Sequence, residues 1–262
     1  MLLALILAAS AFASAKGDLP AYLDPIDATA KALYGPFIGA KKGHFLIERN
    51  AASELVVAGA RRNTVDEYAV IFDHGFLKSP NLTPDAYRFA LCHEIGHLLG
   101  GAPRRPPPAE WEGPVHEDGL MLMSGEGQAD YYATRVCFAR MVEGEDHAAA
   151  LKGKEVPLRL KAACDETWGK DSDAALVCER GAIGSYEMLR MVAPFKISLN
   201  KRDEEIVEKT LVVYPSRQCR LDTAVAGALC REESGLELDA KDPGKHGCGT
   251  GAGARPACWF KR

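Results

Sequence analysis

Three short stretches near the N-terminus are rich in β-branched and aromatic residues and are separated by Gly, Asn and Arg. They span residues 44–48 (HFLIE), 54–58 (ELVVA) and 67–72 (EYAVIF). Runs of this length and composition, bounded by turn residues, are typical of β-strands. The pattern therefore predicts a small sheet in the first third of the chain.

Residues 84–99 place hydrophobic side chains at helical spacing and have signals for both helix ends. The apolar positions are Tyr87, Leu91, Ile95, Leu98 and Leu99. Thr83 is a natural N-cap, and Pro84 suits the first helical position. Gly100 and Gly101 follow directly and favour the end of a helix. We expect an amphipathic helix with one apolar face.

The rest of the chain alternates between helical patterns and irregular segments. Residues 101–125 are rich in Pro and Gly, which predicts a surface loop. Further helices are expected at 126–142, 157–193 and 202–211, and the Gly-rich tail 239–262 is expected to be irregular. Strands followed by helices indicate an α+β fold, with the sheet packed on the two helices that follow it.

Composition and charge narrow the class of protein. The chain has 262 residues, of which 47% are hydrophobic and 26% charged, as expected for one globular domain with a substantial core. The net charge of −4 provides no basic surface for nucleic acid or an anionic membrane. We therefore expect no nucleic-acid partner.

The N-terminal residues have the character of an export signal. The stretch MLLALILAASAFASA contains no charged side chain. It is shorter than the about 20 apolar residues that a membrane-spanning helix needs, and Ala13-Ser14-Ala15 fits the small-x-small pattern of signal peptidase. We predict a signal peptide at residues 1–15 and a single domain at 16–262, secreted or periplasmic. An uncleaved membrane anchor is the alternative, and no other stretch is apolar enough to cross a membrane.

Cysteine usage agrees with export. The mature chain has eight cysteines, an even number, and none of them form a C-x-x-C pair. Behind an export signal this favours disulfides over a zinc ribbon or a redox motif. We expect Cys164 to pair with Cys178 and the last four cysteines to pair among themselves. Cys92 and Cys137 complete four bridges, or stay as two thiols. The cysteines are Cys92, Cys137, Cys164, Cys178, Cys219, Cys230, Cys248 and Cys258.

The run His93-Glu94-Ile95-Gly96-His97 carries the strongest chemical signal. Two histidines four residues apart project from one face of a helix and can hold one zinc ion. Glu94 lies about 100° further round the helix, beside the metal and not bound to it. From there it can take a proton from a metal-bound water, whose pKa falls to about 7. The competing interpretation is an amphipathic helix with two unrelated histidines.

A catalytic zinc site needs a third protein ligand. The metzincin spacing would put a histidine at position 103, where this chain has Pro103, so that class is excluded. A carboxylate on the next helix is the common alternative, and Glu126 and Asp130 lie one turn apart there. We expect Glu126 on the metal, with Asp130 accepting a hydrogen bond from a ligating imidazole. An ordinary solvated helix face, or His116 as the third ligand, are the alternatives.

These two helices resemble a known family. An H-E-x-x-H helix followed by a helix with E-x-x-A-D is similar to the gluzincin peptidases of the CAAX prenyl protease and HtpX type. That family has a third motif, H-P followed five residues later by Arg and an aliphatic residue. Here Pro215, Arg220 and Leu221 match it, whereas Tyr214 replaces the histidine. The resemblance covers residues 67–143 and 210–222.

The resemblance implies one zinc ion per chain and a role for each matched residue. Glu94 would be the general base, and Asp130 would support a ligand. Arg220 would lie on the substrate side. The oxyanion would be stabilised either by the phenol of Tyr214, which replaces the family's histidine, or by a guanidinium. The chain lacks the family's transmembrane helices, so a membrane-embedded prenyl peptide is not the expected substrate. The implied zinc ligands are His93, His97 and Glu126.

Together these patterns predict a secreted zinc-dependent endopeptidase that acts on a protein or peptide. The substrate segment is expected to pair with the sheet edge near residues 67–72. Zinc would polarise the scissile carbonyl while Glu94 drives water onto it and then passes the proton to the leaving amine. Two alternatives remain: a non-catalytic zinc module that binds unfolded chains, and a zinc amidase acting on a non-peptide amide such as a cell-wall link.

Overall fold

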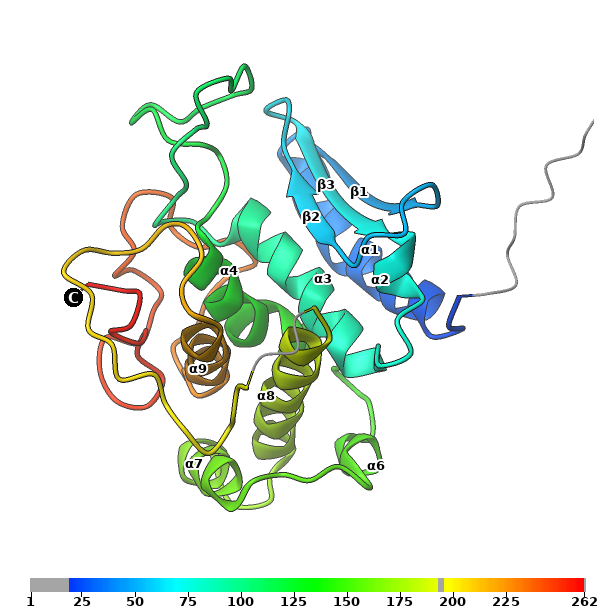
Figure 1. The fold of residues 1–262 in the computed structure, drawn as a ribbon, viewed down its shortest axis with the longest axis vertical. Helices are drawn as coiled ribbons and strands as arrows, with labels where there is room; N and C mark the ends of the chain where they lie inside the picture. The colour runs from blue at the N-terminus through cyan, green and yellow to red at the C-terminus, as the bar shows by residue number, and fades with distance from the viewer. Residues whose placement is uncertain (1–18, 193–195, 262) are drawn as a thin grey trace, which may run out of the picture.

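The computed structural model describes residues 19–192 and 196–261 (Figure 1). Its mixture of helices with one small sheet confirms the predicted α+β class. The predicted signal segment 1–15 lies outside the described residues. No helix within the described ranges combines the length and the apolar character needed to span a membrane.

The sheet has three strands in the order β1-β3-β2. Strand β1 (His44–Asn50) runs parallel to β3 (Glu67–Asp73), and β2 (Ala58–Arg61) runs antiparallel to it. Two predicted strands are therefore confirmed, and β3 is the central one. The expected substrate-binding edge at residues 67–72 is wrong, because β3 is paired on both sides. The open edges belong to β1 and β2.

The predicted strand at residues 54–58 is displaced toward the C-terminus. Residues 54–57 instead lie against the short helix α2 (His74–Leu77). The backbone carbonyls of Ser53 and Leu55 accept hydrogen bonds from the amides of Gly75 and Phe76, at 3.2 and 3.1 Å. The first amides of a helix need acceptors, and this segment supplies them. The contacts of Ser53 and Leu55 with α2 keep this segment away from β3, and pairing with β3 starts only at the carbonyl of Val57, just before Ala58.

Helix α1 (Leu23–Ala40) precedes the sheet and was not predicted. Its buried apolar side chains recur every three or four residues, which is a helical signal present in the sequence. They pack against β1 and against helix α3 (Pro84–Leu99) in the main core. The buried apolar positions are Leu23, Ile26, Ala30, Tyr34 and Ile38.

Helix α3 (Pro84–Leu99) lies at the centre of the molecule, between the sheet and three other helices (Figure 1). These are α4 (Glu126–Tyr132), α8 (Asp173–Val192) and α9 (Arg217–Ala228). Its predicted bounds are confirmed. The Thr83 side chain accepts a hydrogen bond from the amide of Ala86 at 3.1 Å, as an N-cap does. The helix is buried on nearly every side and is not amphipathic, because helices cover the face opposite the sheet.

The second predicted helix is interrupted by a π-helical segment. Helix α4 (Glu126–Tyr132) continues through η1 (Ala133–Phe138) into α5 (Ala139–Met141). The change of winding within one continuous helix is a local feature that hydrophobic periodicity does not report. The predicted loop at residues 101–125 is confirmed as irregular, with isolated bridges.

The C-terminal half is helical, but its boundaries differ from those predicted. The expected helix 157–193 is two helices, α7 (Leu158–Trp168) and α8 (Asp173–Val192), preceded by the short α6 (His147–Leu151). Helix α9 (Arg217–Ala228) was not predicted.

The expected helix at 202–211 is wrong. This segment runs alongside the tail, where the amides of Val207 and Leu211 donate to the carbonyls of Ala257 and Trp259 at 3.0 and 2.8 Å. Pairing with the tail provides the backbone hydrogen bonds that a helix would otherwise supply.

Four disulfides link these elements, as the even cysteine count predicted. Cys164 pairs with Cys178, and the last four cysteines pair among themselves. Both expectations are confirmed. The remaining pair, Cys92 and Cys137, ties α3 to η1, so these two cysteines are not free thiols. The bridges are Cys92–Cys137, Cys164–Cys178, Cys219–Cys258 and Cys230–Cys248.

Candidate metal centre

His93 and His97 on α3 meet Glu126 at the start of α4. One ligand atom from each residue lies within 4.8 Å of the other two. The Nε2 atom of His93 lies 3.5 Å from Oε2 of Glu126, and Nε2 of His97 lies 3.5 Å from Oε1. All three side chains are buried. Two imidazoles and a carboxylate converging in this way form a group that could hold one metal ion.

A close crossing of α3 and α4 brings the three residues together. A Cβ atom added to Gly96 would lie 2.8 Å from the backbone oxygen of Ala129, so only glycine permits this approach. The chain then returns beside α3, where the amide of Ser124 donates to the carbonyl of His97 at 2.8 Å. Glu126 follows two residues later. The loop and the crossing together set the position of its carboxylate.

An oxygen atom lies close to Nδ1 on the far side of each imidazole, as a hydrogen-bond partner of His97 and as an ion-pair contact of His93. The Nδ1 atom of His97 lies 2.9 Å from the backbone oxygen of Ser124. The Nδ1 atom of His93 lies 2.8 Å from Oδ1 of Asp130. An acceptor at Nδ1 favours the tautomer whose Nε2 lone pair is free, and in both rings Nε2 faces Glu126. Asp130 therefore lies where the sequence placed it, beside an imidazole.

Asp130 is in turn held by Arg220 from α9. The guanidinium donates two hydrogen bonds to the carboxylate, Nε to Oδ2 at 2.8 Å and Nη2 to Oδ1 at 2.9 Å. Its Nη2 atom also lies 3.3 Å from Oε2 of Glu126. A bidentate arginine–carboxylate pair is strong and geometrically specific. Arg220 thus connects a third helix to the site.

Arg105 completes the charged groups, and sequence reasoning did not identify it. It lies in the loop at 101–125, and its Nη2 atom donates to Oε1 of Glu126. The only sequence signal was a pair of arginines in a proline-rich loop, which by itself indicates a solvated surface. The structure instead brings Arg105 to the carboxylate that faces both histidines.

Burial and neighbouring charges shift the pKa values of the ligand group in opposite directions. Burial lowers the pKa of His97 to about 3. Burial also opposes the charged form of His93, but the carboxylates of Asp130 and Glu126 outweigh it and raise its pKa to about 9. The imidazoles and Arg220 hold the pKa of Glu126 well below its usual range despite burial. A strongly ionised carboxylate beside two imidazoles is a suitable donor set for a divalent cation, which would displace the extra proton of His93 on binding.

Glu94 lies beside this group and is not one of its three converging ligands. Burial is the main cause that raises its pKa to about 7. A carboxyl group with that pKa can accept and release a proton near neutral pH. The arrangement fits the position predicted for a general base.

The site opens into a cleft of about 270 Å³ between α3 and strand β2. Tyr214 lies at its rim, 72% exposed, with the Arg220 guanidinium 5.9 Å from its ring centroid. The carbonyl of Val57 accepts from the amide of Asp73 at 3.0 Å. Backbone groups alternate in direction along an antiparallel pair, so those of Ala58 and Ala60 point to the open edge. Strand β2 therefore offers the edge beside the site.

Other residues with groups that could bind a metal lie outside this site. His116 does not join the ligand group, and its Nδ1 atom lies 3.4 Å from Asp118. His74 lies 3.3 Å from Glu54, outside the residues that line the cleft. Among the described residues, Asp203, Cys219 and Cys258 also converge, but both sulfur atoms are used in a disulfide. Neither sulfur is therefore a thiolate ligand.

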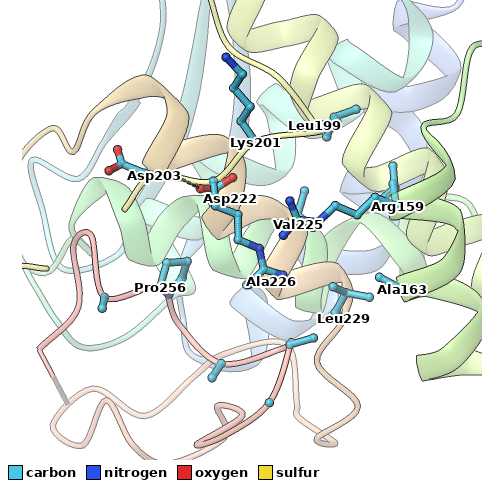
Figure 2. A pocket seen from close by; sticks show the side chains of 16 residues that line it. Arg159, Ala163, Leu199, Lys201, Asp203, Asp222, Val225, Ala226, Leu229 and Pro256 are labelled. Atoms are coloured by element: carbon cyan, nitrogen blue, oxygen red, sulfur yellow. Dashed lines mark hydrogen bonds between the residues drawn. The ribbon is translucent and has the colours of Figure 1, made fainter. Parts of the chain in front are cut away.

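A second hollow of about 230 Å³ lies between α7, α9 and the tail (Figure 2). Figure 2 shows Asp203 and Asp222 side by side, and the amide of Asp203 donates to Oδ2 of Asp222 at 2.6 Å. Gln218 donates to the other oxygen of Asp222 at 2.9 Å. The carboxylate of Asp222 is therefore used to join local segments, and this hollow does not contain the ligand group of the metal centre.

No protein-family model matches the chain, and searches of curated proteins and of solved structures found no significant match. The geometry of the site therefore carries the functional argument.

Proposed function

We propose that this protein is a zinc-dependent peptidase. The observation that carries the proposal is the convergence of His93, His97 and Glu126 with the carboxyl group of Glu94 beside them. A purely structural zinc site has four protein ligands and no use for a buried base next to the metal. Three ligands and a base facing a cleft are the composition of a hydrolytic site.

The donor set fits zinc. Two imidazole nitrogens and one carboxylate oxygen are the ligands of one common class of catalytic zinc site, and the acceptors at both Nδ1 atoms supply the outer support that such sites need. When bound, zinc would polarise the scissile carbonyl and acidify water at its open position.

The chain's own residues would then orient the substrate and move the proton. The outward backbone groups of Ala58 and Ala60 would pair with an extended peptide along the cleft. Glu94 would accept a proton from the attacking water and deliver it to the leaving amine. The phenol of Tyr214 lies at the rim of the same cleft and is the candidate donor to the developing oxyanion.

The family resemblance receives support from the same geometry. Its three motifs lie on α3, on α4 and at the start of α9, and Asp130 and Arg220 meet beside His93. Membership of the CAAX prenyl protease and HtpX group is therefore part of the proposal. Export of the chain is proposed as well, since four disulfides fit an oxidising compartment.

Metal analysis and peptide turnover of matched variants test the proposal. The wild-type protein should bind one zinc ion and hydrolyse an unfolded protein or a quenched peptide, and a chelator should abolish the activity. Glu94→Gln should keep zinc and lose activity by about 10²–10⁴-fold, because an amide cannot accept the proton. Glu208→Gln, at an exposed glutamate, should leave both unchanged.

Three results would contradict it. Zinc binding without turnover of any peptide would indicate the non-catalytic module. Turnover of a cell-wall amide in place of peptides would indicate the amidase. Full activity of Glu94→Gln would remove Glu94 from the mechanism.

A further inference from the structure

Arg105 reaches the metal centre from a loop that is anchored beside it. The amide of Arg105 donates to the carbonyl of Met123 at 3.0 Å, and its carbonyl accepts from the amide of Met121 at 2.9 Å. The amide of Gly125 donates to the carbonyl of Pro103 at 2.9 Å. This ladder ties the backbone of Arg105 to the segment that leads into Glu126. These backbone hydrogen bonds therefore hold the Arg105 guanidinium at the site.

The two arginines of the cleft differ in how many of their donors are used. Arg220 uses two of its nitrogen atoms: Nε and Nη2 both donate to Asp130, and Nη2 also lies 3.4 Å from His93 and 3.3 Å from Glu126. Arg105 has one contact, from Nη2 to Glu126. Its Nε and Nη1 atoms have no acceptor within the described ranges, and its side chain is 27% exposed against 12% for Arg220. Arg105 thus keeps donors available to a ligand in the cleft.

With a divalent cation bound, the charge balance of the site would leave a positive excess. Glu94, Glu126 and Asp130 supply three negative charges against the two guanidiniums of Arg105 and Arg220. A divalent cation held by the ligand group turns this deficit into an excess of one positive charge. Because Arg220 is neutralised by Asp130 at 2.8 Å, the excess belongs to the side of the cleft where Arg105 lies.

The remaining walls of the cleft are apolar. They come from β2 and the segment before it, from α3, and from α8. A cleft with apolar walls beside a charged centre and one available cation favours a ligand with apolar side chains and a single anionic group. The apolar lining includes Val56, Val57, Phe76, Met123, Met188 and Val192.

We propose that Arg105 determines specificity by pairing with a carboxylate of the substrate close to the scissile bond. This inference rests on the proposed peptidase function and names the class of peptide that it accepts. The carboxylate has two sources, an acidic side chain or the free C-terminus of the peptide. A planar guanidinium with open donors can hold either one through two parallel hydrogen bonds.

The test measures binding separately from turnover. Zinc-loaded Glu94→Gln protein is titrated calorimetrically with two matched pairs of apolar peptides. One pair differs as Glu against Gln next to the target bond, and the other as a free against an amidated C-terminus. The carboxylate member of one pair should bind about 10- to 100-fold more tightly, as for a charge-assisted hydrogen bond. Whichever pair shows the preference identifies the source of the carboxylate.

Arg105 variants made in the same Glu94→Gln background decide whether this residue is responsible. Arg105→Gln should bind the carboxylate peptide and its neutral partner with nearly equal affinity. Arg105→Lys should keep part of the preference for the carboxylate peptide. Arg202→Gln, which removes an equal charge from an exposed position outside this cleft, should keep the full preference. Zinc content is measured for each protein, because Arg105 also contacts Glu126.

Several outcomes would overturn the proposal. Equal binding of both members of both pairs would do so, as would an unchanged preference in Arg105→Gln. If Arg105→Gln loses its zinc, the Glu94→Gln protein is compared with its Arg105→Lys variant instead. A weaker preference for the carboxylate peptide in Arg105→Lys supports the proposal. An equal preference in the two proteins overturns it. Carboxylate-selective binding with no turnover by the wild-type protein would contradict the peptidase and support Arg105. Turnover by the wild-type protein without carboxylate-selective binding would support the peptidase and contradict the role of Arg105.

Discussion

Two carboxylates one turn apart on α4 have different partners. Glu126 faces the Nε2 atoms of both histidines at 3.5 Å, whereas Asp130 lies 2.8 Å from Nδ1 of His93 and accepts two hydrogen bonds from Arg220. The first is placed to bind a metal. The second lies beside the ring that would bind it.

Substitution of these two residues should separate the roles. Glu126→Ala removes a ligand and should abolish stable zinc binding, because two imidazoles remain. Asp130→Asn leaves the ligands in place and should weaken zinc affinity by about 10–100-fold. Competition with a chromophoric chelator measures both affinities. Equal loss of zinc in the two variants would contradict the assignment.

Tyr214 has room to act because it is exposed at the rim of the cleft and is not needed for packing. Tyr214→Phe should therefore preserve zinc content and thermal stability. If its phenol donates to the oxyanion, kcat should fall by about 10²-fold. Steady-state kinetics with a quenched peptide check this. A wild-type kcat in the variant would mean that Tyr214 only shapes the rim.

At the scale of elements, the site depends on how closely α3 and α4 approach. Gly96 lies between His93 and His97 on the face of α3 that meets Ala129. A methyl group there would meet backbone atoms, which cannot rotate away as a flexible side chain can. The two helices would have to separate, and Glu126 would move with α4.

Gly96→Ala should destabilise the protein by about 1–3 kcal/mol and lower its zinc affinity. Gly39→Ala is the matched control, because a Cβ atom at that position of α1 meets nothing within 4 Å. It should be neutral or stabilise by up to about 1 kcal/mol, since alanine reduces the freedom of the unfolded chain. Urea unfolding followed by circular dichroism measures both. Equal stability of the two variants would show that the crossing tolerates a side chain.

At the scale of the whole molecule, the C-terminal tail contacts the two helices that carry the ligand group, α3 and α4. The ring of Trp259 packs on Gly127, next to Glu126. Arg255 donates to Gln128 at 2.9 Å, and Gln128 donates to the carbonyl of Gly100 at 2.6 Å, beyond the end of α3. The Cys219–Cys258 disulfide connects this tail to α9 beside Arg220. Segments far apart in the sequence therefore hold one small site.

Loss of the Cys219–Cys258 bridge should affect both stability and metal. Replacing both cysteines by serine should cost about 2–4 kcal/mol of unfolding free energy and lower the affinity for zinc. The same change at Cys164 and Cys178, which join α7 to α8 away from the ligands, should lower stability alone. Chemical unfolding and chelator competition measure the two effects. Equal zinc affinities in the two double variants would contradict a bracing role for the tail.

Local sequence patterns predicted those features that depend on residues within one helix or strand. The cap at Thr83, the spacing of His93 and His97 and the glycines after Leu99 all act within one helix, so α3 and its chemistry were predictable. Prediction failed at residues 202–211, which take their backbone hydrogen bonds from the tail. It also failed just before β2, where the carbonyls of Ser53 and Leu55 accept hydrogen bonds from the first turn of α2. Those partners are distant in sequence, so no local pattern identifies them.

The sequence by itself determined the two imidazoles, the neighbouring Glu94 and the even set of cysteines, because these depend on residue type and short spacing. Only the tertiary structure decided that Glu126 faces both rings, that Arg220 holds Asp130, and that β2 provides the open edge. It also brought Arg105 to the site from a loop whose composition indicates a solvated surface. The physical reason is that a buried charge requires partners from several elements, and packing of those elements decides which partners are within reach.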